Sequence, residues 1–329
     1  MSVGGLFVGL ATLDVVQQVD RLPGSNEKLA ANRTWLAAGG PAAVAAIAFA
    51  ALGGRARLWT ALGSSPAARL VASDLAGAGV DVVDVAPPGF ELAASTVLLD
   101  AVTGERAVVS GSGHAPAFGK IAGPDLAGID VVLLDGHHAA LARSAALAAF
   151  PIPEDVSRGT SETVTKGLPP LAEERSSDTT PVPEEASRGT SEAVTKGRLP
   201  VVVDAGSHKP VFDDVFPFAT DVICSADYLH PAGLQPRDLL RHGPQFVAVS
   251  HGGDPLEWWT ADVSGAVTPP TAVAVDTVGA GDVLHGAYCF WLARGFPRLA
   301  ALQRAAQAAS ERVQHLGPFA WRTALSRRN

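Results

Sequence analysis

Short apolar runs alternate along the chain with alanine-rich stretches whose apolar positions recur at helical spacing. The runs expected to form buried strands are residues 3–10, 57–62, 80–85, 129–134, 201–204, 221–224 and 246–250. Helices are expected over about 41–52, 67–78, 139–150 and 298–316. Strands that alternate with helices in this way favour an α/β fold with a mostly parallel sheet covered by helices on both faces.

One further pair of strands is expected outside this alternation. Residues 95–101 and 105–110 flank the turn-forming sequence Val-Thr-Gly at 102–104, which is typical of a hairpin. A hairpin inserted among strand–helix units predicts a small side sheet that can close over a site.

The stretch that carries the most chemistry is Asp-Thr-Val-Gly-Ala-Gly-Asp at residues 276–282. The apolar run 271–275 precedes it, and apolar residues at helical spacing follow it, so the pattern predicts a strand, a glycine turn and a helix. The first N–H groups of a helix attract anions. A carboxylate inside such a turn suits a base beside a transferring phosphoryl group, which makes Asp282 the candidate base. Alternatively, Asp282 only favours the positive end of the helix.

Two other polar or glycine-rich sites follow predicted strands or open predicted helices. Asp14 comes after the first apolar run, where an acid can bind the hydroxyls of a ligand or cap a turn. Gly39 and Gly40 precede the alanine-rich helix at Pro41 and would let a ligand approach the backbone closely.

Composition limits the class of protein. At 329 residues and 47% hydrophobic, the chain can bury a sizeable core. Its net charge of −8 argues against a general nucleic-acid or anionic-membrane surface. Two cysteines make neither a metal cluster nor a disulfide framework, and with no signal-peptide layout we expect a cytoplasmic protein. The uncharged run 36–54 is mostly alanine and is expected to form a buried helix rather than a membrane span.

Residues 151–199 differ in character from the rest. The sequence at 154–167 returns almost unchanged at 184–197, and Ser157 recurs as Ser187, an offset of 30. The segment is poor in large apolar residues, so we expect a disordered, repeat-containing insertion. A tolerated duplication is favoured over a partner-binding role, because long surface loops are accommodated at little cost.

Together, Asp14, the Gly39-Gly40 helix and the turn at 276–282 resemble the ribokinase-like (PfkB) family of ATP-dependent carbohydrate kinases. The resemblance spans nearly the whole chain except the insertion. It implies a three-layer α/β sandwich formed by residues 1–150 and 200–329, with a mostly parallel central sheet. It also implies a small β lid with strands within about 12–35 and 92–112.

The resemblance assigns roles to individual residues. Asp282 is the base, and the backbone of Gly279, Ala280 and Gly281 forms the anion hole for the γ-phosphate of ATP. Asp276 is the candidate ligand of a monovalent cation such as K⁺. The implied contacts to a small sugar substrate are Asp14, Gly39, Gly40 and Asp282. The implied nucleotide contacts are Ser250, Gly252, Thr277, Gly279, Gly281 and Asp227.

Some positions depart from the family pattern. Ser250 and Gly252 resemble a Thr-x-Gly nucleotide segment, but Pro255 stands where another glycine is usual. Asp227 falls where relatives carry a glutamate that supports Mg²⁺, an ion that would arrive largely with ATP. Val44 stands where many relatives have a sugar-binding asparagine. Arg106, on the predicted hairpin, either faces an anionic group of the substrate or is a solvated surface side chain.

The resemblance is closest to the sulfofructose-kinase-like and ketohexokinase-like branches, and it makes a homodimer a further expectation. The expected reaction is transfer of a phosphoryl group from ATP to a sugar hydroxyl. Two alternatives stay open: a nucleoside kinase of the same fold, and a sugar- or nucleotide-binding regulatory protein that has lost catalysis.

Overall fold

The structure is a computed structural model that describes residues 2–104, 106–111, 118–119, 121–150 and 198–327. The chain divides into two compact units, Met1–Ala149 with Leu199–Asn329, and Phe150–Arg198. Nearly all of the second unit, including the predicted insertion and its repeat, lies outside the described residues. The first unit carries all the elements described below.

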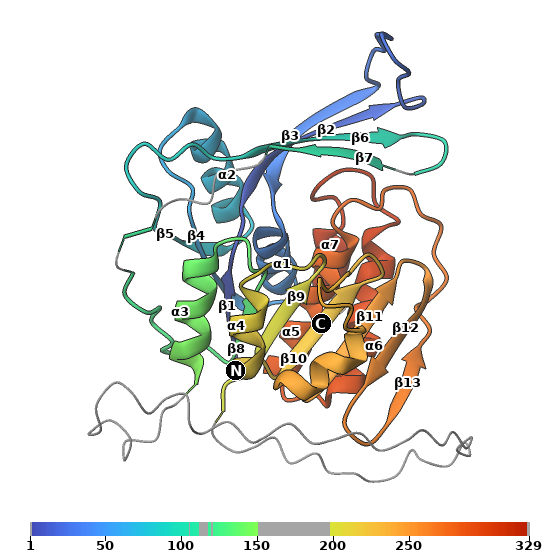
Figure 1. Ribbon diagram of the computed structural model, residues 1–329. Coiled ribbons are helices and arrows are strands. Elements are labelled where there is room, and N and C mark those ends of the chain that lie inside the picture. The colour runs from blue at the N-terminus through green and yellow to red at the C-terminus, as the bar shows by residue number, and fades with distance from the viewer. Residues whose placement is uncertain (1, 105, 112–117, 120, 151–197, 328–329) are drawn as a thin grey trace. The chain divides into compact units, whose positions relative to one another are not determined.

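A nine-stranded sheet forms the centre of this unit, in the order β13-β12-β11-β10-β9-β8-β1-β4-β5 (Figure 1). Its strands are β1 (Gly4–Val8), β4 (Arg55–Thr60), β5 (Val80–Asp84), β8 (Val131–Leu134), β9 (Val201–Ala205), β10 (Asp221–Ser225), β11 (Phe246–His251), β12 (Asp254–Trp259) and β13 (Ser264–Val267). Pairing is parallel from β11 to β5, whereas β12 and β13 join antiparallel at one edge.

Helices cover both faces of the sheet, so the unit has three layers (Figure 1). They are α1 (Pro41–Ala51), α2 (Pro66–Gly77), α3 (Ala139–Ala149), α4 (Phe212–Val215), α5 (Ala280–Ala293), α6 (Arg298–Arg312) and α7 (Arg322–Ser326), with 3₁₀ turns at Phe216–Phe218 and Pro236–His242. Successive side chains of a strand point to opposite faces of the sheet, which explains why there are two cores. Val131 and Leu133 of β8 pack with α1, α5 and α6, whereas Val132 and Leu134 pack with α3 and α4. The expected three-layer α/β fold is confirmed.

A separate four-stranded sheet, β3-β2-β6-β7, projects from this body (Figure 1). Its strands are β2 (Thr12–Val19), β3 (Arg33–Gly39), β6 (Ala94–Asp100) and β7 (Arg106–Ser110). β6 and β7 pair antiparallel, as the hairpin prediction required. Because β2 begins four residues after β1 ends, this sheet starts from the carboxyl edge of the central sheet, the edge where parallel sheets bind ligands.

Three expectations from the sequence are wrong. Residues 271–275 form no strand, because β13 ends at Val267 and an irregular segment leads to α5. Asp14 lies inside β2 rather than in a loop. The helix expected over 298–316 ends at Arg312.

The uncharged run at 36–54 behaves as expected. It contributes the end of β3 and the buried helix α1, in which Ile47 and Phe49 are fully buried. In the part of the chain that the structure describes, no helix is both long enough and apolar enough to cross a membrane.

Candidate active site

The glycine turn at 276–281 starts α5. Gly279 adopts a left-handed conformation with φ of 72°, and the first helical hydrogen bond runs from the N–H of Val283 to the carbonyl of Gly279 (3.0 Å). A side chain is disfavoured at that φ, which explains the glycine. A Cβ added at Gly281 would meet no other atom within 4 Å, so the first turn of the helix borders open space. Its N–H groups are therefore placed to receive an anion.

Asp282 lies in this first turn and has a shifted pKa. Burial raises the pKa of its carboxyl to about 7, and the negative charges of Asp204, Asp14 and Asp135 add to the rise, while His285 opposes it. A carboxyl whose pKa lies near neutrality can accept a proton at neutral pH and release it again, as a general base requires. The sequence analysis proposed this role from the motif alone.

One turn further along α5, His285 connects the helix to the central sheet. Its Nδ1 lies 3.4 Å from Oδ2 of Asp204 at the end of β9, and its Nε2 lies 3.3 Å from the carbonyl of Ile223 in β10. Both side chains of the pair are buried. Asp204 is not among the site residues expected from the sequence; its one signal is an acid directly after an apolar run.

Asp14 reaches the site from β2 of the four-stranded sheet. Its Oδ1 accepts a hydrogen bond from the Thr12 hydroxyl (2.7 Å), and burial raises its pKa against the opposing effect of Thr12 and Ser95. A Cβ on Gly39 would lie 2.1 Å from the carboxyl carbon of Asp14. The space that glycine leaves at this position is therefore filled by the Asp14 carboxylate.

Asp135, at the end of β8, holds the neighbouring backbone together. Its Oδ2 accepts hydrogen bonds from the N–H groups of Leu10 (2.8 Å) and Ala42 (3.2 Å), and its Oδ1 accepts one from His137 (2.9 Å). These bonds join the loop after β1, the start of α1 and the loop after β8. At Gly40 the φ of 94° and the close approach of the Leu10 carbonyl, 2.5 Å from an added Cβ, both require glycine.

Helices α1 and α5 approach each other closely at the site. A Cβ on Gly286 would lie 2.2 Å from the carbonyl of Ala45, so only glycine permits this packing. As a result Val44 of α1 faces the turn, 3.4 Å from the position of a Cβ on Gly279. Val44 is thus beside the glycine turn, and it brings a methyl group rather than a polar group to that point.

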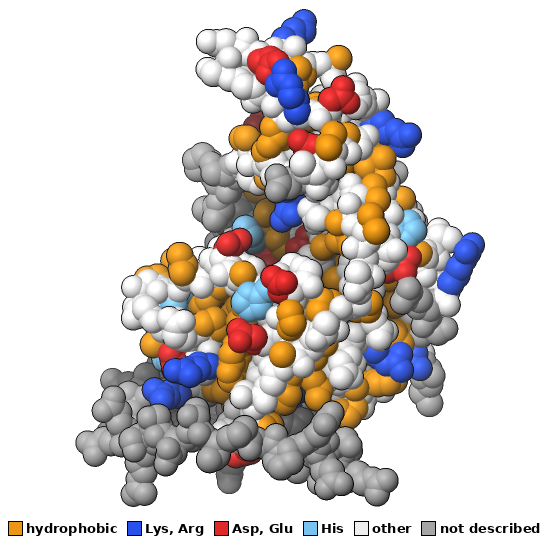
Figure 2. Space-filling model, turned by 90° about the vertical axis from the view of Figure 1, so that its right-hand side faces the viewer, with side chains coloured by type: hydrophobic (Ala, Val, Ile, Leu, Met, Phe, Trp, Pro, Cys, Tyr) orange, Lys and Arg blue, Asp and Glu red, His pale blue; other side chains and the backbone are white. Residues whose placement is uncertain are grey.

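The four-stranded sheet contacts the same turn through β7. Nη1 of Arg106 donates to the hydroxyl (3.1 Å) and the carbonyl (3.5 Å) of Thr277, and the Thr277 hydroxyl donates to the carbonyl of Gly104 (3.3 Å). Arg106 is exposed and yet bound to the turn, which is neither of the two arrangements considered from the sequence. Figure 2 shows a hollow below the projecting sheet, with acidic, basic and histidine side chains around it.

The candidate nucleotide residues follow β10 and β11. Ser250 donates from its hydroxyl to the carbonyl of Cys224 (3.4 Å), Gly252 turns the chain with φ of 64°, and Asp227 is exposed just after β10. Because β9, β10 and β11 are parallel, their ends share one edge with Asp204. His285 contacts β9 and β10 at this edge, which brings α5 next to them.

Asp276 lies beneath the turn and is buried. It forms an ion pair with Arg312 at the end of α6, with Nη2 and Oδ2 3.1 Å apart. The sequence offered no sign of this partner, because Arg312 lies 36 residues away in an ordinary helical pattern.

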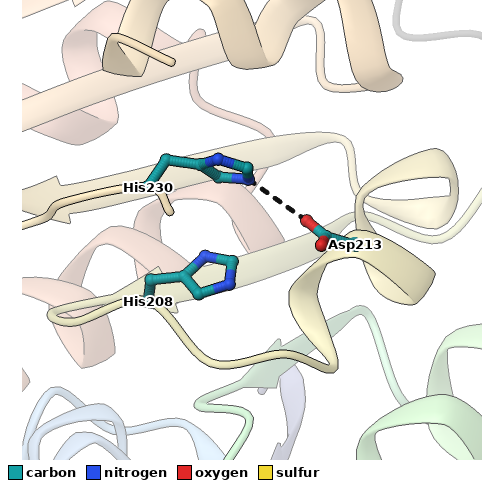
Figure 3. Close-up of side chains that lie close together, drawn as sticks. All are labelled: His208, Asp213 and His230. Atoms are coloured by element: carbon teal, nitrogen blue, oxygen red, sulfur yellow. Dashed lines mark hydrogen bonds and ion pairs between the residues drawn. The ribbon is translucent and has the colours of Figure 1, made fainter. Parts of the chain in front are cut away.

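Among the described residues, one cluster has the composition of a metal site: His208, Asp213 and His230 (Figure 3). Nδ1 of His230 accepts a hydrogen bond from the N–H of Ala232 (3.1 Å), so the ring proton is on Nε2, which points at Oδ1 of Asp213 (3.2 Å). That nitrogen is a donor and has no lone pair for a metal. The arrangement is that of a hydrogen-bonded loop, and we assign no metal to it.

Comparison with known proteins agrees with this geometry. Residues 6–150 and 232–321 match the model of the pfkB family carbohydrate kinases. Among curated proteins, none is similar in sequence to this chain. A candidate ribokinase from Agrobacterium tumefaciens is 26% identical, with 100% of this chain and 97% of that chain covered and a TM-score of 0.75.

Two further structures share the fold. Ribokinase from Arabidopsis thaliana, solved with ribose and ATP, is 18% identical with a TM-score of 0.67, and the match covers 99% of this chain and 98% of that one. A nucleoside kinase from Burkholderia thailandensis, solved with inosine, is 14% identical with a TM-score of 0.65 and coverage of 98% and 96%. The chain therefore belongs to the pfkB family of carbohydrate kinases, and is a phosphotransferase with an alcohol group as acceptor.

Proposed function

We propose that this protein transfers the γ-phosphate of ATP to a hydroxyl of a sugar or sugar derivative, with Asp282 as the base. The observation that carries the proposal is the position of Asp282, in the first turn of α5 directly behind the left-handed Gly279, with a pKa of about 7. The Arabidopsis ribokinase crystallised with ribose and ATP supports a sugar as acceptor and ATP as donor.

Each part of the site then has a task. The acceptor hydroxyl gives its proton to the Asp282 carboxylate as its oxygen attacks the γ-phosphorus, and the bond from that phosphorus to the β–γ bridging oxygen breaks, so that ADP leaves. Backbone N–H groups of Gly279, Ala280 and Gly281 stabilise the charge that accumulates on the transferred group. Asp14, held beside Gly39 and Gly40, accepts a hydrogen bond from a second hydroxyl and so orients the acceptor.

The nucleotide enters along the carboxyl edge of β10 and β11. Ser250 and Gly252 would contact it there, and Thr277 would help to shape the phosphate end. In proteins Mg²⁺ is bound by few carboxylates and keeps several of its water ligands. The exposed Asp227 could accept a hydrogen bond from one of these waters. When bound, Mg²⁺ would neutralise charge on the phosphates.

Two alternatives remain. A nucleoside kinase is supported by the Burkholderia structure, whose TM-score of 0.65 hardly differs from the 0.67 of the Arabidopsis ribokinase. A binding protein without catalysis is suggested by Val44, which supplies no hydrogen bond beside the turn. The carboxylate of Asp282 argues against it, because a negative charge in an anion-binding turn weakens simple phosphate binding.

The test is consumption of Mg-ATP across a panel of ketoses, aldoses, sugar phosphates, sulfosugars and nucleosides. Sugar-dependent turnover that Asp282→Asn lowers by roughly a hundredfold or more would support the proposal. The matched control is Asp262→Asn, a change at an exposed loop aspartate, which should leave turnover unchanged. Turnover with nucleosides alone would select the nucleoside kinase, and equal turnover in Asp282→Asn would remove that residue from the mechanism.

We further propose that the protein is a cytoplasmic homodimer whose insertion is separate from the kinase domain. The four-stranded sheet exposes Leu36, Val108 and Val109, which supports a homodimer formed through it, and light scattering would give the mass. The cytoplasmic location fits the two cysteines, which are buried and free. The insertion at residues 151–199 is expected to be dispensable, so its deletion should leave turnover unchanged.

A further inference from the structure

Asp276, the residue proposed as a ligand of a monovalent cation, already accepts three hydrogen bonds through its carboxylate. Oδ1 accepts a hydrogen bond from the N–H of Val278 (2.9 Å). Oδ2 accepts one from the N–H of Gly317 (3.0 Å) and one from Nη2 of Arg312 (3.1 Å). The protein itself thus balances the charge of this carboxylate and occupies most of its acceptor sites.

Arg312 also donates hydrogen bonds to two backbone carbonyls near Asp276. Its Nη1 donates to the carbonyl of His315 (2.8 Å) and to the carbonyl of Asp276 (3.3 Å). Arg312 and Asp276 are each 1% exposed. One dehydrated positive charge is therefore surrounded by a carboxylate and two carbonyls, which is the all-oxygen environment that a bound alkali cation would need.

The ion pair is mechanically connected to the anion-binding turn. The N–H groups of Val275 (2.7 Å) and Asp276 (3.1 Å) both donate to the carbonyl of Val313, which caps α6 directly after Arg312. Asp276 in turn fixes Val278 through its side chain, one residue before Gly279. These hydrogen bonds, together with Arg312, fix the position of the turn relative to the end of α6.

We infer that Arg312 is a built-in cation and a positioning residue, which replaces a bound monovalent cation and holds the turn that receives the γ-phosphate. The residues around Asp276 do not fit K⁺, since the ion would have to displace a buried guanidinium from three hydrogen-bonded oxygen atoms. The catalytic consequence rests on the proposed kinase function, whereas the absence of a K⁺ site does not.

The first test uses the wild-type chain in KCl and in choline chloride at equal ionic strength. The thermal unfolding midpoint, the affinity for ADP by calorimetry, and turnover with the best acceptor of the panel should be the same in both salts. A rise in any of them that is specific to K⁺ would overturn the inference. The midpoint and ADP affinity need no acceptor, so failure to find one counts against the proposed function alone.

The second test removes the guanidinium. Arg312→Ala leaves the Asp276 carboxylate and two carbonyls facing a space, so ADP affinity should fall and K⁺ should raise it again more than choline does. Arg304→Ala, in the same helix but exposed, is the matched control and should show neither effect. If Arg312→Ala does not fold, Arg312→Lys, which keeps a charge with fewer donors, should fold with weakened ADP affinity. ADP binding in Arg312→Ala that equals wild type in both salts would overturn the positioning role.

Discussion

Nη1 of Arg106 lies 3.1 Å from the hydroxyl of Thr277, and this contact joins β7 of the four-stranded sheet to the turn that begins α5. The same hydroxyl donates to the carbonyl of Gly104, so both partners of Thr277 come from the hairpin β6–β7. The contact is exposed and therefore easily exchanged for water. In the proposed kinase it makes the hairpin sensitive to the state of the phosphate-binding turn, because movement of either one breaks these bonds.

Replacing Arg106 with alanine should weaken acceptor or nucleotide binding more than it slows the chemical step. A net contribution of about 0.5–1.5 kcal/mol for a hydrogen bond corresponds to a rise in KM of roughly two- to tenfold. Steady-state kinetics would separate KM from kcat. The matched control is Arg33→Ala, an exposed arginine of the same sheet, which should leave both constants unchanged.

Gly39→Ala should damage the acceptor side of the site without unfolding the protein. The new Cβ would lie within 2.1 Å of Asp14 and push its carboxylate away from the Thr12 hydroxyl. We expect KM for the acceptor to rise while ADP affinity is kept. Gly77→Ala is a suitable control, because a Cβ there meets nothing within 4 Å. Equal KM values in the two variants would show that the position of Asp14 does not matter for the acceptor.

The pH dependence of turnover follows from the raised pKa of Asp282. A base must be ionised, so kcat/KM should increase as the pH rises through about 7 and then level off. The neighbouring groups that contribute charge are Asp204, Asp14, Asp135 and His285. Initial rates measured from acid to alkaline pH would test this. A profile that is flat through pH 7 would mean that Asp282 is already ionised well below neutrality.

The same shift has a consequence for stability. The folded protein binds the Asp282 proton more tightly than the unfolded chain, whose carboxyl has a pKa near 3.8, so this residue stabilises the fold least at high pH. Stability from this group should fall as the pH rises from about 4 to about 7. Asp282→Asn lacks the effect, so it should unfold at a higher temperature than wild type at pH 8, and the gain should disappear toward pH 4.

The ion pair at the base of the sheet should contribute strongly to the stability of the fold. Asp221, which is fully buried, accepts hydrogen bonds from Nε of Arg298 (2.7 Å) and from the hydroxyl of Tyr288 (2.9 Å). Asp221→Ala removes the buried carboxylate that pairs with the part-buried guanidinium of Arg298, which should cost up to about 3–5 kcal/mol. Urea unfolding would measure the loss. Asp262→Ala, at an exposed loop position, is the control.

The strands of the parallel sheet, the hairpin β6–β7, the longer helices and the glycine turn before α5 could be predicted from the sequence because their signals are local. Buried strands such as β9 and β10 are continuous apolar runs. The start of α5 is indicated by Gly279 and Gly281, which come just before its apolar residues. Asp282 was identifiable as a candidate for the same reason, since the glycine turn is adjacent to it in the chain, whereas the acids that help to raise its pKa lie far along the chain.

The remaining features depend on contacts between distant residues. Thr271, Val273 and Val275 have the composition of a strand, yet Pro269 and Pro270 come directly before them. The N–H of Val275 pairs with the end of α6 instead of with a strand. Asp204 and Arg312 escaped notice because their roles come from partners that lie far along the chain.

Asp135, which follows β8, accepts hydrogen bonds from the N–H groups of Leu10 and Ala42, which lie 125 and 93 residues away. It thereby joins the loop after β1 and the start of α1 to the loop after β8. The acceptor side of the site therefore cannot assemble before β8 has joined β1. In native-state hydrogen exchange, these two amides should exchange only when the whole unit opens, at the slow rate of its core strands. The pocket and the fold would then be lost in a single cooperative step, with no intermediate that keeps one without the other.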